Sequence, residues 1–251
     1  IFPVTSTLIS GEKDAVLVDA QFSVNDAKNL GKLIQDSGKN LKYIIITAGD
    51  PDYYFGLEPL VHAFPNVKVI ATPEVVQHIE ATKDGKFAYW GPILKAGAPS
   101  QIVVPRAIED KTIKLEGEKI EIKAPGKYAS YLWVPSNRTI LGGVGLSSGI
   151  HLWTADAQTT EARDEWRKTV KQMNRLHPHA VIPGHYMGEI PSATKAIDFT
   201  YQYLVDVDKV LKEHKNSASV IAALKEKYPN LVEESSLELS SKVLTGEMEW
   251  K

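Results

Sequence analysis

The alternation of short β-rich runs with helical patterns is the feature that most constrains the fold of this chain. Leu41–Thr47 is a continuous apolar run, as expected for a strand covered on both faces of its sheet. A helix that Ser23 or Asn25 can cap precedes it and continues to about Gln35. Thr72 opens another helix, with a proline at its first position. Strands and helices in this order predict an α/β layer structure.

Both halves of the chain, about residues 1–110 and 111–251, contain such elements. The first half predicts strands at 4–9, 15–20, 41–47 and 67–71, and helices at about 23–35, at 53–64 and from 72 onward. The second half predicts strands at 112–115, 119–124, 131–134, 139–141 and 180–182, a helix at about 160–176 and a helical C-terminal extension from about 191. Because no low-complexity segment or flexible linker separates the halves, the sequence predicts one domain over residues 1–251.

Composition limits the partners of the chain. The formal net charge of −2 gives no electrostatic basis for binding nucleic acid or an anionic membrane surface. No apolar run approaches the roughly 20 residues of a membrane span, so we expect a soluble protein, cytoplasmic or periplasmic, with a small-molecule ligand. The absence of cysteine excludes disulfides, thiolate metal sites and cysteine nucleophiles.

A turn rich in carboxylates follows the Leu41–Thr47 run. The stretch TAGDPDYYFG, residues 47–56, places Asp50 and Asp52 two residues apart, directly before Tyr53. Folds often build chemistry where a rigid strand delivers polar groups to its C-terminal edge. We therefore expect the functional site at this turn.

The order of these motifs resembles the metallo-β-lactamase superfamily, whose hallmark turn reads His-x-His-x-Asp-His. The matching stretches are VLVDA (16–20), TAGDPDYYFG (47–56), APGKYASYLWVPSNRTILGG (124–143), GIHLWTAD (149–156) and IPGHYMG (182–188). The resemblance spans nearly the whole chain. It implies an αβ/βα four-layer sandwich with a hydrolytic site at the sheet edges between the two halves.

Most metal-ligand positions of that family carry other residues here. The first turn's four ligand positions fall on Ala48, Asp50, Asp52 and Tyr53, the middle histidine on Lys127, the bridging aspartate on Gly143 and the last histidine on His185. A hydrolytic zinc needs about three protein ligands and an open position. The resemblance therefore implies no tight zinc pair and no firm cofactor. Asp50, Asp52 and His185 could hold at most one weakly bound divalent cation, zinc or similar.

Lys127 has two interpretations. It can replace the positive charge of the metal and pair with Asp50 and Asp52. It can also be a catalytic amine, because burial lowers the pKa of a lysine and frees it to form a Schiff base. The same residue pattern fits natural loss of the ligands and deliberate redesign into a lysine-dependent enzyme such as a retro-aldolase.

Two further residues are catalytic candidates beside Lys127 and Asp52. His151 can act as a general base, or it can be a half-buried histidine hydrogen-bonded to the backbone. Tyr53 can donate to a developing oxyanion, or it can fill the space that a metal would take.

Three functions remain open from the sequence. The first is a hydrolase relative with a degenerate metal site, in which the family mechanism implies that a metal-bound water attacks a carbonyl or phosphoryl centre and that Asp52 orients this water. The second is a Schiff-base catalyst that uses Lys127. The third is a binding protein that kept the scaffold and its pocket without catalysis.

Overall fold

The structure, a computed structural model, describes residues 2–124 and 129–250. The chain divides into two compact units: an N-terminal unit, Val4–Val144, and a C-terminal unit, Gly145–Lys251 with Ile1–Pro3. The division lies between residues 144 and 145, later in the chain than the predicted halves. The assignment of both units to one domain stays a prediction.

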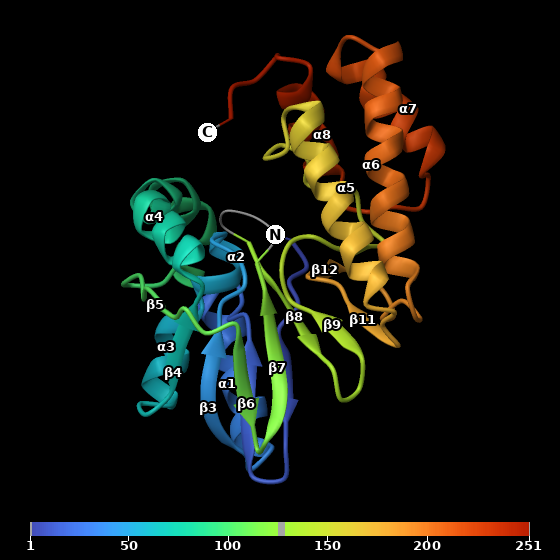
Figure 1. Cartoon of the computed structure of the whole chain (residues 1–251). Helices are drawn as coiled ribbons and strands as arrows, with labels where there is room; N and C mark the ends of the chain where they lie inside the picture. Colours follow the sequence, from blue (N-terminus) through green and yellow to red (C-terminus); the bar gives the residue numbers. More distant parts are fainter. Residues whose placement is uncertain (1, 125–128, 251) are drawn as a thin grey trace. The chain divides into compact units, whose positions relative to one another are not determined.

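The N-terminal unit contains a mixed sheet with its helices (Figure 1). In this sheet β1 and β2 are antiparallel, and each later neighbouring pair is parallel. The strands, in spatial order, are β1 (Thr7–Ser10), β2 (Asp14–Val18), β3 (Asn40–Ile45), β4 (Lys68–Ala71) and β5 (Arg106–Ala107). The helices are α1 (Val24–Asp36), α2 (Pro51–Tyr54), α3 (Leu57–Ala63), α4 (Pro73–Leu94) and the 3₁₀ helix η1 (Lys95–Gly97).

An antiparallel meander completes this unit. It consists of β6 (Thr112–Leu115), β7 (Glu118–Lys123), β8 (Tyr131–Val134) and β9 (Thr139–Leu141), each paired with the next. The interior residues of β2 are buried, and so are Ile44 and Ile45 of β3, as the apolar pattern predicted. Earlier in β3, Lys42 is exposed and Tyr43 is partly buried, so the first part of this strand is not covered on both faces. Ser23 caps α1, since its side chain accepts a hydrogen bond from the backbone N–H of Asp26.

The C-terminal unit is mostly helical. Helices α5 (Thr160–Arg175) and α6 (Lys195–Glu213) pack together, as do α7 (Ser217–Lys227) and α8 (Glu234–Leu244) (Figure 1). Its short strands are β10 (Ser147–Ser148), β11 (Ala180–Ile182) and β12 (His185–Tyr186). A buried cluster around Leu152, Tyr203, Leu204 and Leu237 forms its core.

The helix predicted at Tyr53–Phe64 is two helices, α2 and α3, so that prediction was wrong. The Tyr53 carbonyl accepts from the backbone N–H of Ala20 at 2.8 Å, and the N–H of Gly56 donates to the carbonyl of Gln21. A Cβ at Gly56 would lie 2.0 Å from the carbonyl oxygen of Ala20. The chain segment after β2 therefore takes the hydrogen bonds of a continuous helix and requires glycine at the break.

The predicted α/β class, with two sheets and flanking helices, is confirmed. The first strand begins at Thr7 rather than Val4, and β3 ends at Ile45 rather than Thr47. Among the residues that the structure describes, none of the helices is long and apolar enough to cross a membrane.

Candidate functional site

A buried hydrogen-bond network holds the turn that follows β3. Asp19 comes directly after β2, has the left-handed φ of 63° and is fully buried. Its carboxylate accepts from the backbone N–H of Thr47 at 2.8 Å and from the Thr47 hydroxyl at 2.6 Å. Because this bond takes the amide of Thr47 out of the ladder, β3 ends before it. Asp19 is a residue of the candidate site that we did not predict, although it lies within the VLVDA motif.

The ionisation of Asp19 is controlled by its surroundings. Burial raises the pKa of this carboxyl from its ordinary value of 3.8 to about 7, and the negative charge of Asp52 adds to the rise. The hydrogen bonds from Thr47 lower the pKa and offset part of this effect. Asp19 and Asp52 are therefore two neighbouring carboxyl groups of which the more buried one resists ionisation.

The segment around Gly143 closes the network. The N–H of Gly143 donates to the Thr47 hydroxyl oxygen at 2.7 Å, and Gly142 and Gly143 both have positive φ. A Cβ at Gly143 would lie 2.3 Å from the carbonyl oxygen of Ser130. The position that the resemblance aligns with the bridging aspartate is thus one where the backbone leaves no room for a side chain.

Ala48 is likewise enclosed. It is fully buried and forms an isolated antiparallel bridge with Ala129. The neighbouring Ser130 donates its backbone N–H to the carbonyl of Thr47 at 2.6 Å and its hydroxyl to the same oxygen at 3.0 Å. The first aligned histidine position therefore holds a small side chain inside the core.

Helix α2 carries Asp52 and Tyr53. The Asp52 side chain lies in the first turn of the helix and is nearly buried, with a relative exposure of 9%. Tyr53 is fully buried and its hydroxyl donates to the carbonyl of Gly143 at 3.3 Å. Burial, followed by the charge of Asp52, holds the pKa of Tyr53 well above its ordinary value. Tyr53 fills the turn as one interpretation predicted, and its role toward an oxyanion stays a prediction.

Asp50 precedes α2 and faces a cation from another helix. Lys86 of α4 places its Nζ 3.4 Å from Oδ1 of Asp50 and donates to the carbonyl of Gly49 at 2.9 Å. Lys86 was not among the predicted site residues. Its distance of 36 positions from Asp50 left no local signal in the sequence.

The remaining predicted residues belong to the C-terminal unit or lie outside the described residues. His185 begins β12, and its Nδ1 lies 2.6 Å from the carbonyl oxygen of Pro3, so Nδ1 carries the proton. His151 is buried, with Nδ1 2.9 Å from the Tyr203 hydroxyl, and burial lowers its pKa from 6.5 to about 4. His151 is thus a neutral core histidine at neutral pH, and its catalytic role stays a prediction. Lys127 lies outside the described residues.

Within residues 2–124 and 129–250, no group of three or more histidine, aspartate or glutamate side chains is arranged to hold a metal ion. Asp50 and Asp52 belong to the N-terminal unit and His185 to the C-terminal unit. A weak ion shared by these three residues therefore stays a prediction.

The fold agrees with comparisons to known proteins. The family model of the metallo-β-lactamase superfamily matches residues 1–185. The chain belongs to this superfamily, as the sequence motifs indicated. No curated protein matches the chain.

Several solved metallo-β-lactamases share the fold. VMB-1 is 19% identical and has a TM-score of 0.62, covering 82% of this chain and 86% of its own. A metallo-β-lactamase from Pontibacter korlensis is 19% identical with a TM-score of 0.59, covering 82% and 88%. DIM-1 metallo-β-lactamase is also 19% identical with a TM-score of 0.59, covering 81% and 88%. The predicted metallo-β-lactamase-like fold is confirmed.

Proposed function

We propose that this chain is a hydrolase of the metallo-β-lactamase fold with a degenerate metal centre. It acts on a small molecule at the turn of residues 47–53, without the zinc pair for which the family motif supplies ligands. The proposal rests on the superfamily match and on the geometry of the aligned ligand positions.

The single observation that carries the proposal is the backbone at Gly143. Its positive φ and the 2.3 Å approach that a Cβ would make to the carbonyl oxygen of Ser130 leave no space for a ligand side chain. Ala48 adds to this because it is buried and offers no donor atom. Asp50 and Asp52 supply oxygen ligands, but a hydrolytic zinc needs about three ligands in fixed geometry. The described residues of the N-terminal unit do not fit a zinc pair.

Asp52 is the group that we assign to the reaction. In this role its carboxylate accepts a proton from a water molecule as that water attacks a carbonyl or phosphoryl centre, which is general base catalysis. Asp19, whose carboxyl is buried and resists ionisation, adds no competing negative charge while it holds its proton. The natural substrate is a small molecule that carries an ester, amide or phosphoryl bond.

The test combines metal analysis with hydrolysis. We expect the purified protein to contain less than about a tenth of an equivalent of zinc, iron or manganese, the level of contamination. A panel of esters, lactones, amides and phosphoesters is then assayed with and without a chelator. We expect a hydrolytic activity that the chelator does not change.

The matched variants are Asp52→Asn and Asp110→Asn. Loss of a general base lowers the rate by about 10²–10⁴-fold, whereas the exposed Asp110 serves as a control with unchanged rate. One equivalent of bound zinc, or an activity that chelation abolishes, would overturn the proposal. A folded protein that binds members of the panel without hydrolysing them would instead favour the binding-protein alternative.

A further inference from the structure

Lys86 reaches from α4 into the turn that carries the two aspartates. Its Nζ donates to the carbonyl of Gly49 at 2.9 Å, lies 3.4 Å from Oδ1 of Asp50 and lies 3.1 Å from Nε2 of His78. The side chains of Lys86 and Asp50 are about equally sheltered, with relative exposures of 24% and 25%. The ammonium group is therefore held inside the turn region rather than extended into solvent.

The three partners match the chemistry of an ammonium group. A charged lysine has three N–H donors and no acceptor. A carbonyl oxygen, a carboxylate oxygen and an imidazole nitrogen are here its three acceptors. His78 must then be neutral, with its proton on Nδ1, and burial followed by the charge of Lys86 lowers its pKa in agreement with this.

The position of this cation matters because Asp50 is aligned with a metal-ligand position of the family. Like charges at short range repel, and the repulsion is stronger where the groups are sheltered from water. A divalent ion on the carboxylate of Asp50 would be close to the ammonium group, which already occupies that carboxylate. Either Lys86 or the ion can neutralise Asp50, and both together are unfavourable.

We propose that Lys86 is a built-in cation that holds Asp50 in place of a divalent metal, so that the ammonium group and a metal ion compete for the same carboxylate. This inference rests on the proposed function, in which the purified protein holds no stoichiometric metal. It differs from the role considered for Lys127, because the competing charge comes from α4.

The helix offers a matched control for this idea. Lys83 lies one turn before Lys86 and pairs with Glu80 on the same helix. Replacing Lys83 therefore removes one positive charge from α4 without changing the contacts of Asp50. A difference in zinc affinity between the Lys86 and Lys83 variants therefore reports on the contact of Lys86 with Asp50 and not on the net charge of the protein.

The experiment titrates four proteins with zinc alone by isothermal calorimetry: wild type, Lys86→Gln, Lys86→Arg and Lys83→Gln. We expect Lys86→Gln to bind zinc at least about tenfold more tightly than wild type, since the competing charge is gone. Lys86→Arg keeps a positive charge at position 86, and Lys83→Gln leaves the ammonium group of Lys86 in place. The zinc affinity of both variants is therefore expected within about twofold of wild type. Circular dichroism confirms that each variant is folded.

Equal zinc affinity of Lys86→Gln and wild type would overturn the inference, as would a gain in Lys86→Arg as large as that in Lys86→Gln. If Lys86→Gln does not fold, Lys86→Met replaces it. Failure of both neutral variants to fold would also overturn the inference, because Lys86 would then be required for the fold itself. Stoichiometric zinc in the wild type would contradict the proposed function, a result distinct from a metal-poor wild type whose neutral variants gain nothing.

Discussion

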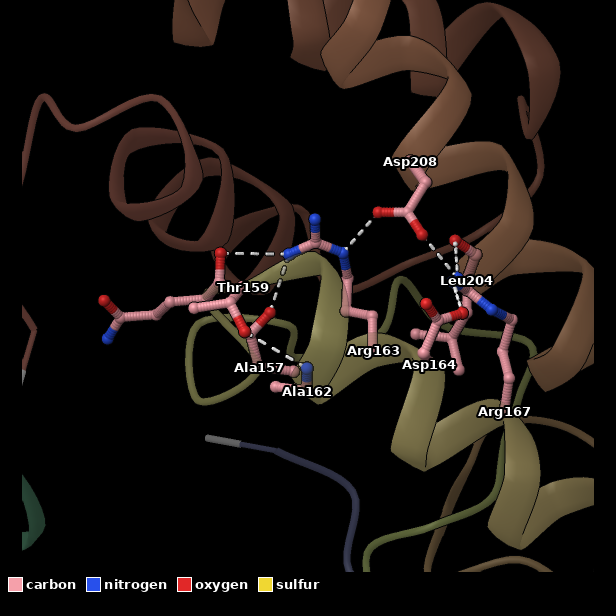
Figure 2. Close-up of polar contacts among 9 residues, drawn as sticks. Ala157, Thr159, Ala162, Arg163, Asp164, Arg167, Leu204 and Asp208 are labelled. Atoms are coloured by element: carbon pink, nitrogen blue, oxygen red, sulfur yellow. Dashed lines mark hydrogen bonds and ion pairs between the residues drawn. The ribbon is translucent and has the colours of Figure 1, made fainter.

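The two units bury aspartate side chains in opposite ways. In the C-terminal unit, Asp208 of α6 accepts from Nε of Arg163 at 2.6 Å and from Nη1 of Arg167 at 2.5 Å, as Figure 2 shows. In the N-terminal unit, Asp19 accepts from the amide and hydroxyl of Thr47, which are neutral donors, and lies near the charge of Asp52. One carboxylate is neutralised by two cations, and the other is buried at the cost of a raised pKa.

This difference separates a structural cluster from a candidate site. A buried charge that is paired and fully hydrogen-bonded joins two helices and leaves little chemistry available. A buried carboxyl beside a second carboxylate has a perturbed pKa, which is typical of functional sites. The comparison therefore supports the turn after β3, rather than the contact between α5 and α6, as the proposed site, and four predictions test it.

The largest expected effect is at Asp208. Asp208→Ala leaves the Arg163 guanidinium, whose side chain is only 4% exposed, without its anionic partner. Loss of one member of a buried ion pair lowers the free energy of unfolding by about 3–5 kcal/mol. Urea denaturation measures this.

Asp164→Ala is the matched control for Asp208. Asp164 also pairs with Arg167, but its side chain is 53% exposed. An exposed ion pair contributes about 0–1 kcal/mol. Equal losses for the two variants would mean that the Arg163–Asp208–Arg167 cluster is not the structural element we describe.

The second prediction concerns the pH dependence that Asp19 imposes. Between pH 3.8 and about 7 the folded protein holds a proton on Asp19 that the unfolded chain has lost. The unfolded state binds fewer protons in this window, so the contribution of Asp19 to stability falls as the pH rises. The full pKa change corresponds to a loss on the order of 4 kcal/mol.

Asp19→Asn isolates this contribution, because asparagine does not ionise. The variant loses a constant amount from its altered hydrogen bonds. Relative to wild type it should nevertheless gain stability from about pH 4 to about pH 7 and then level off, and urea midpoints at several pH values measure the gain. A difference between the two proteins that stays flat with pH would show that Asp19 is not protonated in the folded state.

The third prediction tests the backbone at Gly143. Gly143→Ala places a Cβ against the carbonyl oxygen of Ser130 and also strains a residue with a φ of 79°. We expect a loss of about 2–3 kcal/mol in thermal or urea unfolding, from the strain and the overpacking together.

Gly117→Ala separates these two causes. Gly117 has a φ of 94° and no atom within 4 Å of a built Cβ, so it loses only about 1 kcal/mol from strain. If the two variants lose the same stability, Gly143 has room for a side chain. The geometric basis of the proposed degenerate metal centre would then be removed.

The sequence predicted those parts of the fold that depend on local pattern. The continuous apolar run of β3, the Ser23 cap of α1 and the amphipathic pattern of α5 each determine an element from neighbouring residues. The family resemblance then supplied the order of the motifs. Together these gave the fold class and the turn that carries Asp50 and Asp52.

The parts that the sequence did not predict depend on distant contacts. The break at Gly56 arises from backbone hydrogen bonds to the segment after β2, and Asp19 becomes a site residue through a contact 28 positions away. Lys86 reaches Asp50 from a helix whose hydrophobic pattern says nothing about the turn. An aspartate directly after an apolar strand, as in VLVDA, was the one signal that could have identified Asp19.

The smallest expected effect is at Thr47, the residue that joins Asp19 to Gly143. Thr47→Val keeps the shape of the side chain but removes the hydroxyl that donates to Asp19 and accepts from the N–H of Gly143. Losing these neutral hydrogen bonds lowers the free energy of unfolding by about 1–2 kcal/mol. The exposed Thr112 of β6 is a matched control, and Thr112→Val should change stability by less than about 0.5 kcal/mol.

The pH dependence of the Thr47→Val loss shows what the hydroxyl does for Asp19. Because the Thr47 hydrogen bond lowers the pKa of Asp19, its removal raises that pKa further and disfavours the ionised form. The loss of stability should therefore be larger at pH 8, where the Asp19 carboxyl of the wild-type protein is ionised, than at pH 5, where it is protonated. The same loss at both pH values would mean that Thr47 only fills space, and Asp19 would then resemble a structural aspartate more than a member of the site.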